Sequence, residues 1–455
     1  MRIHKKSLIR FAKYFLFFSI AIVFLYFVLG FQMPAMKKRI YLFAMWFFAE
    51  LYLWVSIYRT FDLFSKKEKQ GSGKKATEII FTVLYWIPAV VIAVAVFFLA
   101  GKGIQHIDQS SYLTIVGVCV IQYLSKFLLF LLLIIFDAVA YLIKRFFLSS
   151  FAIKVARKRF FKIELGIYIF CFLLLMYGMI WGAYNFTLRE IALFTHNKSL
   201  KNKELRIVLV SDLHLASWRT EKPIEKVVQL INEQHPDIIF LAGDYVQFSS
   251  SEFIRYIPIL RHLKANYGIY SVLGNHDYGR YSHFPDEKSR KKDVQKLIDY
   301  QENLGWHVLL NQNEKLILDS LGNSITIAGI EYYSPKKLFI NEGDMDKTFE
   351  NIDTSDYVIF LSHDPQAWLS VKERNLPANL TLSGHTHGMQ LGVYTSFIRW
   401  SPASLLYKQW AGLYSDPRFP NKKLYVNVGL GSVGLPARVG IDPEITVIKL
   451  VGDGD

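Results

Sequence analysis

Two histidines at the end of an apolar run are well placed for metal chemistry. The run at residues 380–383 ends at Gly384, and His385 and His387 then stand between Gly384 and Gly388. In an extended or turning segment, residues i and i+2 project to the same side, and glycines permit the tight path. The pattern predicts a turn that directs two imidazoles into one small volume.

Four further apolar runs, each typical of a buried strand, also end in metal-binding residue types. The residues that follow these runs are Asp212 and His214 after 207–210, Asp244 after 238–242, Asn275, His276 and Asp277 after 269–273, and His363 and Asp364 after 357–361. In open α/β sheets, ligands bind beyond the carboxyl ends of the strands, so we expect these side chains to meet in space. Carboxylate, amide and imidazole groups without a thiolate favour Mn, Fe or Zn over a structural zinc cage.

Strand and helix patterns alternate along the part of the chain that carries these residues. Helical stretches are expected at 221–233, 251–264 and 291–303, and further strands at 325–330, 424–428 and 445–450. Such alternation favours sheets covered by helices. We therefore predict an α/β domain of two packed β-sheets flanked by helices over residues 205–455.

The first part of the chain is predicted to be a membrane domain. Hydrophobic residues make up 52% of the sequence, and the long apolar runs lie near residues 14–36, 40–58, 79–100, 112–143 and 165–188. A span needs about 20 apolar residues. This predicts an all-α transmembrane bundle of about five helices within residues 1–190, followed by a polar linker at 191–204.

The basic residues predict the orientation of this bundle. Lys and Arg gather in residues 59–78 and 144–162, and such clusters are typical of cytoplasmic loops. Five crossings of a plasma or inner membrane from a cytoplasmic N-terminus place the C-terminal domain outside the cytoplasm. If the long fourth segment formed two spans, the C-terminal domain would instead lie in the cytoplasm. Among the charged residues in the spans, Lys126 is expected to pair with Glu50 or Asp137.

The formal charge of +15 is unevenly distributed. Residues 1–200 hold 25 Lys and Arg against 8 Asp and Glu, and the remainder holds 28 against 30. Because the domain with the candidate ligands is nearly neutral, no nucleic-acid partner is expected. Cys119 and Cys171 fall in apolar runs and predict packing, with no disulfide framework.

The motifs Asp-x-His, Gly-Asp, Gly-Asn-His-Asp, a His after a strand, and Gly-His-x-His occur in the order that is typical of the calcineurin-like metallophosphoesterases, and residues 205–450 resemble that family. The tail motifs, which include Pro436-Ala437-Arg438, are similar to a membrane-anchored subgroup of bacterial integral-membrane phosphoesterases and an animal transmembrane protein with a metallophosphoesterase domain. At position 389, directly before Gln390, this subgroup commonly has a small residue, whereas this chain has Met389. The difference bears on the shape of the substrate pocket and not on the metal chemistry.

The resemblance implies two divalent metal ions. The residues implied as ligands are Asp212, His214, Asp244 and His387 for one ion, and Asp244, Asn275, His363 and His385 for the other, with Asp244 as the bridge. Two ions about 3.5–4 Å apart can share a hydroxide and hold the phosphoryl oxygens. His276 would act on the phosphoryl group as a cation or general acid with its ring oriented by Asp277, and Asp364 would support the ligand beside it.

Four residues that follow the ligand motifs are candidates for substrate contact. They are Arg219, Tyr245, Tyr278 and Gln390, and loop packing is the alternative for each. The aromatic-rich segment at 394–410 predicts either core packing or insertion into the bilayer interface.

These observations predict a membrane-anchored phosphoesterase. We expect it to hydrolyse a phosphomonoester, phosphodiester or pyrophosphate of a lipid-linked substrate, with the lipid bilayer as its partner. Two alternatives stay open, namely a nucleotide-lipid pyrophosphatase of the UDP-diacylglucosamine type and a non-enzymatic membrane sensor that binds metal or phosphate.

Overall fold

The computed structural model describes residues 36–60, 80, 82–91, 109–146, 150–335 and 341–453. The chain divides into two compact units, of which the first comprises Met1–Val90 and Val120–Leu173 and the second Val91–Cys119 and Leu174–Asp455. Each unit is described by itself.

Two described helices are long and apolar enough to cross a membrane. These segments, Gln109–Ile143 and Val155–Tyr184, lie largely within α5 (Gln109–Phe146) and α6 (Ser150–Ile180). They correspond to the predicted spans at 112–143 and 165–188. The prediction of about five spans is not confirmed. The apolar part of α2 (Met36–Thr60) is only Trp46–Ile57, the third span is described only at 80 and 82–91, and the first lies outside the described residues up to position 35.

Two ion pairs lie among the described helices of the first unit. Lys126 Nζ lies 3.1 Å from Glu50 Oε2, which confirms the predicted pairing of this lysine with an acid. Asp137 lies 2.6 Å from Arg157 Nη1 and accepts a hydrogen bond of 2.6 Å from the Tyr52 hydroxyl. Pairing offsets part of the cost of burying charge, so these residues have a structural role.

The second unit contains two six-stranded sheets. In spatial order, the first sheet consists of β1 (Thr187–Thr195), β14 (Glu444–Gly452), β2 (Glu204–Val210), β3 (Ile238–Leu241), β4 (Ile269–Ser271) and β5 (His307–Val308). The second consists of β12 (Gly412–Asp416), β13 (Phe419–Val426), β9 (Leu380–Ser383), β8 (Tyr357–Leu361), β7 (Ser324–Gly329) and β6 (Gln312–Ile317). The strands β2 to β5 run parallel to one another, as do β7, β8, β9 and β13.

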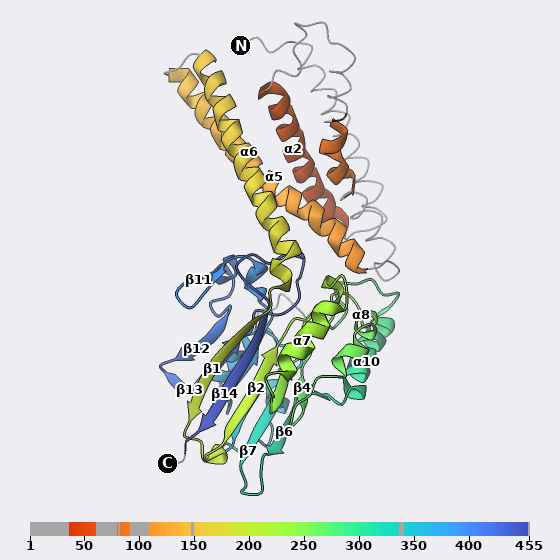
Figure 1. Ribbon diagram of the computed structural model, residues 1–455, viewed down its shortest axis with the longest axis vertical. Coiled ribbons are helices and arrows are strands. Elements are labelled where there is room, and N and C mark those ends of the chain that lie inside the picture. Colours follow the sequence, from red (N-terminus) through yellow and green to blue (C-terminus); the bar gives the residue numbers. More distant parts are fainter. Residues whose placement is uncertain are drawn as a thin grey trace. The chain divides into compact units, whose positions relative to one another are not determined.

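The two sheets pack face to face, as predicted. Ile207 and Leu209 of β2 belong to the core between the sheets, while Val208 and Val210 pack under the helices, because successive strand residues point to opposite faces. Helices α7 (Lys222–Asn232) and α10 (Glu287–Asn303) cover the outer face of the first sheet (Figure 1), and α12 (Ala367–Glu373) covers that of the second. Burial on both faces explains the continuous apolar runs.

The first part of the linker predicted at 191–204 is wrong, because residues 187–195 form β1, while the remainder connects β1 to β2 through η4. Strand β1 pairs in parallel with β14 over its full length. Exposed and half-buried positions alternate along β1, and only Leu193 is buried, so the sequence resembles a polar connection. The helix predicted at 251–264 is also divided, into α8 (Ser251–Ile254) and α9 (Ile257–Leu260). Pro258 lies at the start of α9, where a missing N–H is tolerated.

The remaining elements are short. They are α11 (Met345–Thr348), η3 (Gly182–Tyr184), η4 (Lys198–Leu200), η5 (Leu215–Ser217), η6 (His387–Gln390), η7 (Pro402–Leu405), and the antiparallel hairpin of β10 (Val393–Tyr394) and β11 (Arg399–Trp400). The hairpin and η7 follow the turn that carries His385 and His387.

Candidate metal centre

The strand ends and the histidine turn bring the predicted ligands together. Two groups of three have ligand atoms within 4.8 Å of one another, namely Asp212, His214 and His387, and Asp244, His363 and His385. A third such group joins His214, Asp244 and His276, so the first two groups are adjacent. Parallel strands place their carboxyl ends at one edge of the sheet, which is why residues distant in sequence meet here.

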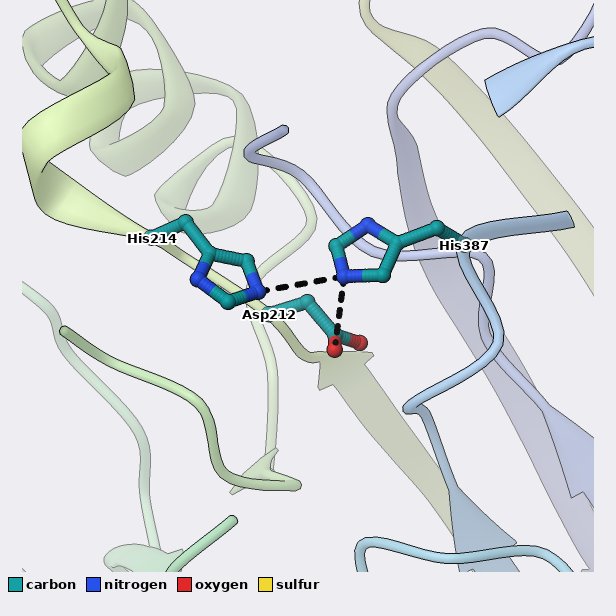
Figure 2. Close-up of side chains that lie close together, drawn as sticks. All are labelled: Asp212, His214 and His387. Atoms are coloured by element: carbon teal, nitrogen blue, oxygen red, sulfur yellow. Dashed lines mark hydrogen bonds and ion pairs between the residues drawn. The ribbon is translucent and has the colours of Figure 1, made fainter. Parts of the chain in front are cut away.

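The first group joins the end of β2 to the turn after β9. His387 Nε2 lies 3.1 Å from His214 Nε2 and 3.2 Å from Asp212 Oδ1 (Figure 2). Ser211 Oγ lies 2.5 Å from Asp212 Oδ2 and 3.0 Å from Asn427 Oδ1. The Asp212 carboxylate is therefore held from behind while it faces the two imidazoles.

The second group joins the ends of β3, β8 and β9. His363 Nε2 lies 3.1 Å from Asp244 Oδ2 and 3.2 Å from His385 Nδ1. The same carboxylate oxygen, Asp244 Oδ2, lies 3.6 Å from His214 Nε2 of the first group. Asp244 thus faces both groups, which is the position that the family resemblance implies for a bridging ligand.

The backbone of the centre is strained. Five of the ligand candidates have positive φ angles, which are 53° at Asp212, 38° at His214, 56° at Asp244, 74° at His385 and 50° at His387. Residues with a Cβ rarely adopt this conformation, and each costs on the order of 1–3 kcal/mol. Because such strain gathers at functional sites, the clustering here supports a role in binding or catalysis.

Two of the ligand candidates, Asn275 and His363, have atoms that are available to bind a metal ion. Asn275 Oδ1 is buried without a hydrogen-bond partner, while its Nδ2 donates to the Tyr281 hydroxyl at 3.0 Å. The free atom is therefore the carbonyl oxygen, which can coordinate a cation. His363 Nδ1 lies 2.6 Å from the Ala242 carbonyl oxygen, which places a proton on Nδ1 and directs Nε2 toward the cluster. This donor set suits Mn, Fe or Zn.

The pKa shifts favour cation binding by most of these groups. Burial opposes ionisation of the two carboxyls, but His387 keeps the pKa of Asp212 below its usual range, and His363 does the same for Asp244. Burial also lowers the pKa of His214 and of His385, so both are neutral at pH 7. Despite burial, Asp244 raises the pKa of His363 to about 10. Metal binding at His363 would therefore release a proton.

His276 is oriented by the backbone. Its Nδ1 lies 3.0 Å from the Gln247 carbonyl oxygen, and its ring stacks on Tyr281 with centroids 4.1 Å apart. The prediction that Asp277 orients this ring is wrong, because the Asp277 carboxylate accepts hydrogen bonds from the N–H groups of Asp244, Tyr245, Val246 and Gly274. Asp277 holds the loop that carries the bridging candidate. Burial lowers the pKa of His276, which disfavours the predicted cation.

Asp364 does not contact the ring that it was expected to support. Its carboxylate accepts hydrogen bonds from Gln366 N at 2.8 Å and from the Tyr332 hydroxyl at 3.5 Å. The neighbouring His363 ring is fixed by the carbonyl of Ala242. The expected support of a ligand therefore comes from a backbone atom.

Three of the four candidates for substrate contact pack within loops. Tyr278 donates to Glu331 Oε1 at 3.1 Å, and Tyr245 donates to the Leu241 carbonyl oxygen at 3.0 Å. Gln390 accepts from Val433 N at 2.7 Å and donates to carbonyls of the same loop. Arg219 is exposed, and its carbonyl accepts from Arg255. The described contacts of Tyr245, Tyr278 and Gln390 favour the packing alternative, whereas Arg219 stays a candidate for substrate contact.

Several neighbours of the ligands were missed by the sequence reasoning. Tyr407 Oη lies 2.9 Å from His385 Nε2. Arg438 Nη2 lies 3.3 Å from His387 Nδ1, and the completely buried guanidinium donates to the carbonyls of Val428, Gly431 and Ile441. The tail motif Pro436-Ala437-Arg438 was a signal for this arginine, although its role could not be read from the motif.

A buried carboxylate behind His276 was also missed. Glu252 Oε2 accepts from Gln247 N at 2.6 Å and Ala216 N at 3.2 Å, and its Oε1 accepts from Phe248 N at 2.7 Å and Ser249 N at 3.1 Å. Because the Gln247 carbonyl orients His276, Glu252 positions that histidine through the backbone. A single Glu in a serine-rich stretch gives no sequence signal for this role.

The two-sheet fold and its Asp, Asn and His cluster define the class of metal-dependent phosphoesterases. The sequence profile of the calcineurin-like phosphoesterase family matches residues 205–389. The chain is 33% identical over 249 residues to the uncharacterized metallophosphoesterase YkuE of Bacillus subtilis, which covers 54% of this chain and 78% of that protein. It therefore belongs to the calcineurin-like metallophosphoesterases and is a metal-dependent phosphoesterase.

Other relatives differ in how much of their length is matched. The uncharacterized metallophosphoesterase YkoQ of Bacillus subtilis is 30% identical over 254 residues, which are 54% of this chain and 83% of that protein. The transmembrane protein with metallophosphoesterase domain of Danio rerio is 29% identical over 249 residues, which are 54% of this chain and 53% of that protein. A transmembrane protein thus occurs among the relatives, and this chain has two described helices that are long and apolar enough to cross a membrane.

Proposed function

We propose that this chain is a membrane-anchored enzyme that hydrolyses a phosphate ester or pyrophosphate of a lipid-linked substrate at a centre of two divalent cations. The observation that carries the proposal is the pair of adjacent ligand groups with Asp244 facing both. Two sets of anionic and neutral donors side by side suit two cations better than one.

We assign the proposed ligands to two cations according to the two groups of side chains. Asp212, His214, Asp244 and His387 would hold one cation, and Asp244, Asn275, His363 and His385 the other. Bound cations of the Mn, Fe or Zn type supply Lewis acidity and an activated water, and they polarise the phosphoryl oxygens. This supply of positive charge explains how a nearly neutral domain can bind phosphate.

His276 would lie beside the cations and interact with the reacting phosphate. The hydrogen bond from its Nδ1 to the Gln247 carbonyl leaves Nε2 for a phosphoryl or leaving-group oxygen. Glu252 fixes Gln247, and Tyr281 stacks on the ring, so the imidazole is held in one orientation. A positioned histidine can stabilise or protonate the leaving oxygen, a contribution of about 10²–10⁴ in rate.

The proposed orientation places the catalytic domain outside the cytoplasm. The connection between α5 and α6 is flanked by basic residues, with Lys144 and Arg145 before it and Lys154, Arg157, Lys158 and Arg159 after it. Positive charge of this kind favours the cytoplasmic side. The opposite end of α6 leads into β1 through η3, so a multi-pass protein of this topology carries the catalytic domain on the other side.

The test uses the full chain in lipid nanodiscs. After chelation and reloading with Mn²⁺, Fe²⁺ or Zn²⁺, we expect two metal ions per chain and turnover of bis(p-nitrophenyl) phosphate and of a lipid phosphate in the disc. Asp244→Ala should lose metal and turnover, while Asp346→Ala, which removes an exposed carboxylate, should retain both. Full turnover by Asp244→Ala would refute the centre. A reporter fused after residue 453 tests the orientation.

A further inference from the structure

A group of exposed apolar side chains lies on the segment that follows the ligand turn. We call it the apolar rim and define it as Met389, Phe397, Ile398, Trp400, Leu405 and Leu406. Phe397 is 96% exposed at the turn of the β10–β11 hairpin, and Leu405 is 85% exposed at the end of η7. Large apolar groups gathered on a soluble surface mark an interaction site.

The charges around the rim favour an anionic partner. Residues 385–412 contain Arg399 and Lys408 and no Asp or Glu, and both basic residues are exposed. Aromatic and aliphatic groups together with Lys and Arg are the composition of segments that lie in a membrane interface. Basic residues near an anionic lipid surface are attracted to it.

The base of the rim is attached to the end of the candidate span α6, within the second unit. Arg438 N donates to the Gly178 carbonyl of α6 at 3.1 Å, Val439 N donates to the Gln390 carbonyl at 2.8 Å, and Gly392 N donates to the Val439 carbonyl at 2.9 Å. A Cβ on Gly178 would overlap the Val439 side chain. Only a glycine at position 178 therefore permits this close approach.

The end of α6 itself has the aromatic residues of a membrane boundary. Tyr177 and Trp181 are both more than half exposed, and their rings stack with centroids 5.7 Å apart. Tyr and Trp are enriched where a span leaves the hydrocarbon. The segment that carries the rim is thus linked to the part of α6 that marks the boundary through Arg438 and Val439, of which the first bonds to α6 and the second to Gln390 and Gly392.

The other end of the rim is attached to the metal centre. Tyr407, which directly follows Leu406, has its hydroxyl 2.9 Å from His385 Nε2. Thr386 Oγ1 donates to the Trp410 carbonyl at 2.6 Å, and Ser401 Oγ donates to the Gly388 carbonyl. The rim therefore connects the membrane boundary to the turn that carries the ligands.

We infer that the apolar rim inserts into the lipid interface at the end of α6 and that a lipid phosphate reaches the cations along it. The inference rests on the proposed membrane anchoring. Insertion removes from water apolar side chains that would otherwise face it, which favours the inserted state. The occupant of the rim is the bilayer, with anionic lipids preferred.

Fluorescence quenching of a label on the full chain tests insertion directly. Ser396, at the hairpin turn, is replaced by Cys in a Cys119→Ala and Cys171→Ala background and labelled with an environment-sensitive dye. In nanodiscs of phosphatidylcholine and phosphatidylglycerol, nitroxide lipids should quench this label strongly. The matched control is Leu321→Cys, at an 88% exposed site between β6 and β7, which should not be quenched. Equal quenching at the two positions would overturn the inference.

A substrate comparison tests the functional part. In Phe397→Ser/Leu405→Ser/Leu406→Ser, the ratio of lipid-phosphate turnover to bis(p-nitrophenyl) phosphate turnover should fall about tenfold, equivalent to about 1.4 kcal/mol. Ile317→Ser/Leu321→Ser is the control and should keep the ratio of the unmodified chain. An unchanged ratio in the rim variant, or a dimer that covers the rim and leaves the label unquenched, would refute the inference.

The two proposals fail in different ways. Absence of metal-dependent turnover of the chromogenic ester in the unmodified chain would refute the proposed function, whereas the quenching measurement does not depend on turnover. Quenching without turnover would therefore support membrane insertion alone.

Discussion

Replacement of Arg438 by Met should strongly destabilise the catalytic domain. The guanidinium is completely buried and is the donor for the carbonyls of Val428, Gly431 and Ile441. A buried acceptor that loses its donor costs about 1–3 kcal/mol, so three such acceptors give about 3–9 kcal/mol. We expect a value near the lower limit, about 3 kcal/mol, because Met fills much of the same volume and no longer requires burial of a charge.

Thermal unfolding of the full chain in nanodiscs measures this effect. For a domain of about 250 residues, 1 kcal/mol shifts the unfolding temperature by about 2–4 °C, so Arg438→Met should unfold about 6–12 °C lower. Arg438→Lys keeps the charge but cannot reach all three carbonyls at once, since it lacks the planar fork of donors. Its unfolding temperature should lie between those of Arg438→Met and the unmodified chain.

Metal titration separates the role of Arg438 at the ligand from its role in stability. Its Nη2 lies 3.3 Å from His387 Nδ1, so loss of the guanidinium should also weaken metal binding at temperatures where the variant is folded. The control is Arg418→Met, because Arg418 is exposed and its described hydrogen bonds go to Asp416; a surface pair of this kind contributes about 0–1 kcal/mol. If Arg438→Met unfolded at the same temperature as Arg418→Met, the reasoning would be wrong.

Four further predictions concern the centre and its supports. His276→Ala should keep both metal ions by elemental analysis but lower kcat by about 10²–10⁴; loss of metal would instead make His276 a ligand. Chelation should lower the unfolding temperature measured by scanning fluorimetry, because the ligand groups are left without the cations they face, and reloading should restore it. Glu252→Gln keeps only one of two acceptor oxygens, so Gln247 is held less firmly and the His276 ring is less well oriented. We therefore expect kcat to fall about tenfold at unchanged metal content. Burial raises the pKa of Glu252 from 4.5 to about 7. The folded state therefore retains a proton that the unfolded state has lost, and this carboxyl's contribution to the unfolding free energy should fall by about 3 kcal/mol as the pH rises through that window. Denaturant unfolding at several pH values should show this slope in the unmodified chain and not in Glu252→Gln.

The positions of the ligand candidates could be predicted because each follows a buried strand directly. The apolar run before Asp244 is buried on both faces and ends where the carboxylate begins, so local sequence and parallel pairing together determine the location. The same reasoning applies to Asp212 and His363. The end of a strand can be located in the sequence when the strand is a continuous apolar run, as it is before each of these three residues.

The supports of the site could not be predicted, because they depend on backbone atoms of distant loops. The partner of His276 Nδ1 is the carbonyl of Gln247, and the partner of His363 Nδ1 is the carbonyl of Ala242. Side-chain identity carries no information about such acceptors, since every residue has a carbonyl. Asp277 was therefore assigned to the wrong partner. Strand β1 escaped notice for a different reason, because an edge strand with one buried residue has a polar sequence.

The place of β14 in the first sheet has a consequence for the order of assembly during translation. This strand is the last along the chain, yet it lies between β1 and β2 and is hydrogen-bonded to both. All the proposed ligands are synthesised before residue 388, but β1 has no partner in the sheet until residues 444–452 have emerged from the ribosome. In the proposed membrane anchoring, α6 enters the bilayer before that moment. The first sheet is therefore expected to be completed only after nearly the whole chain has been synthesised, with β1 unpaired in the intermediate that precedes this step.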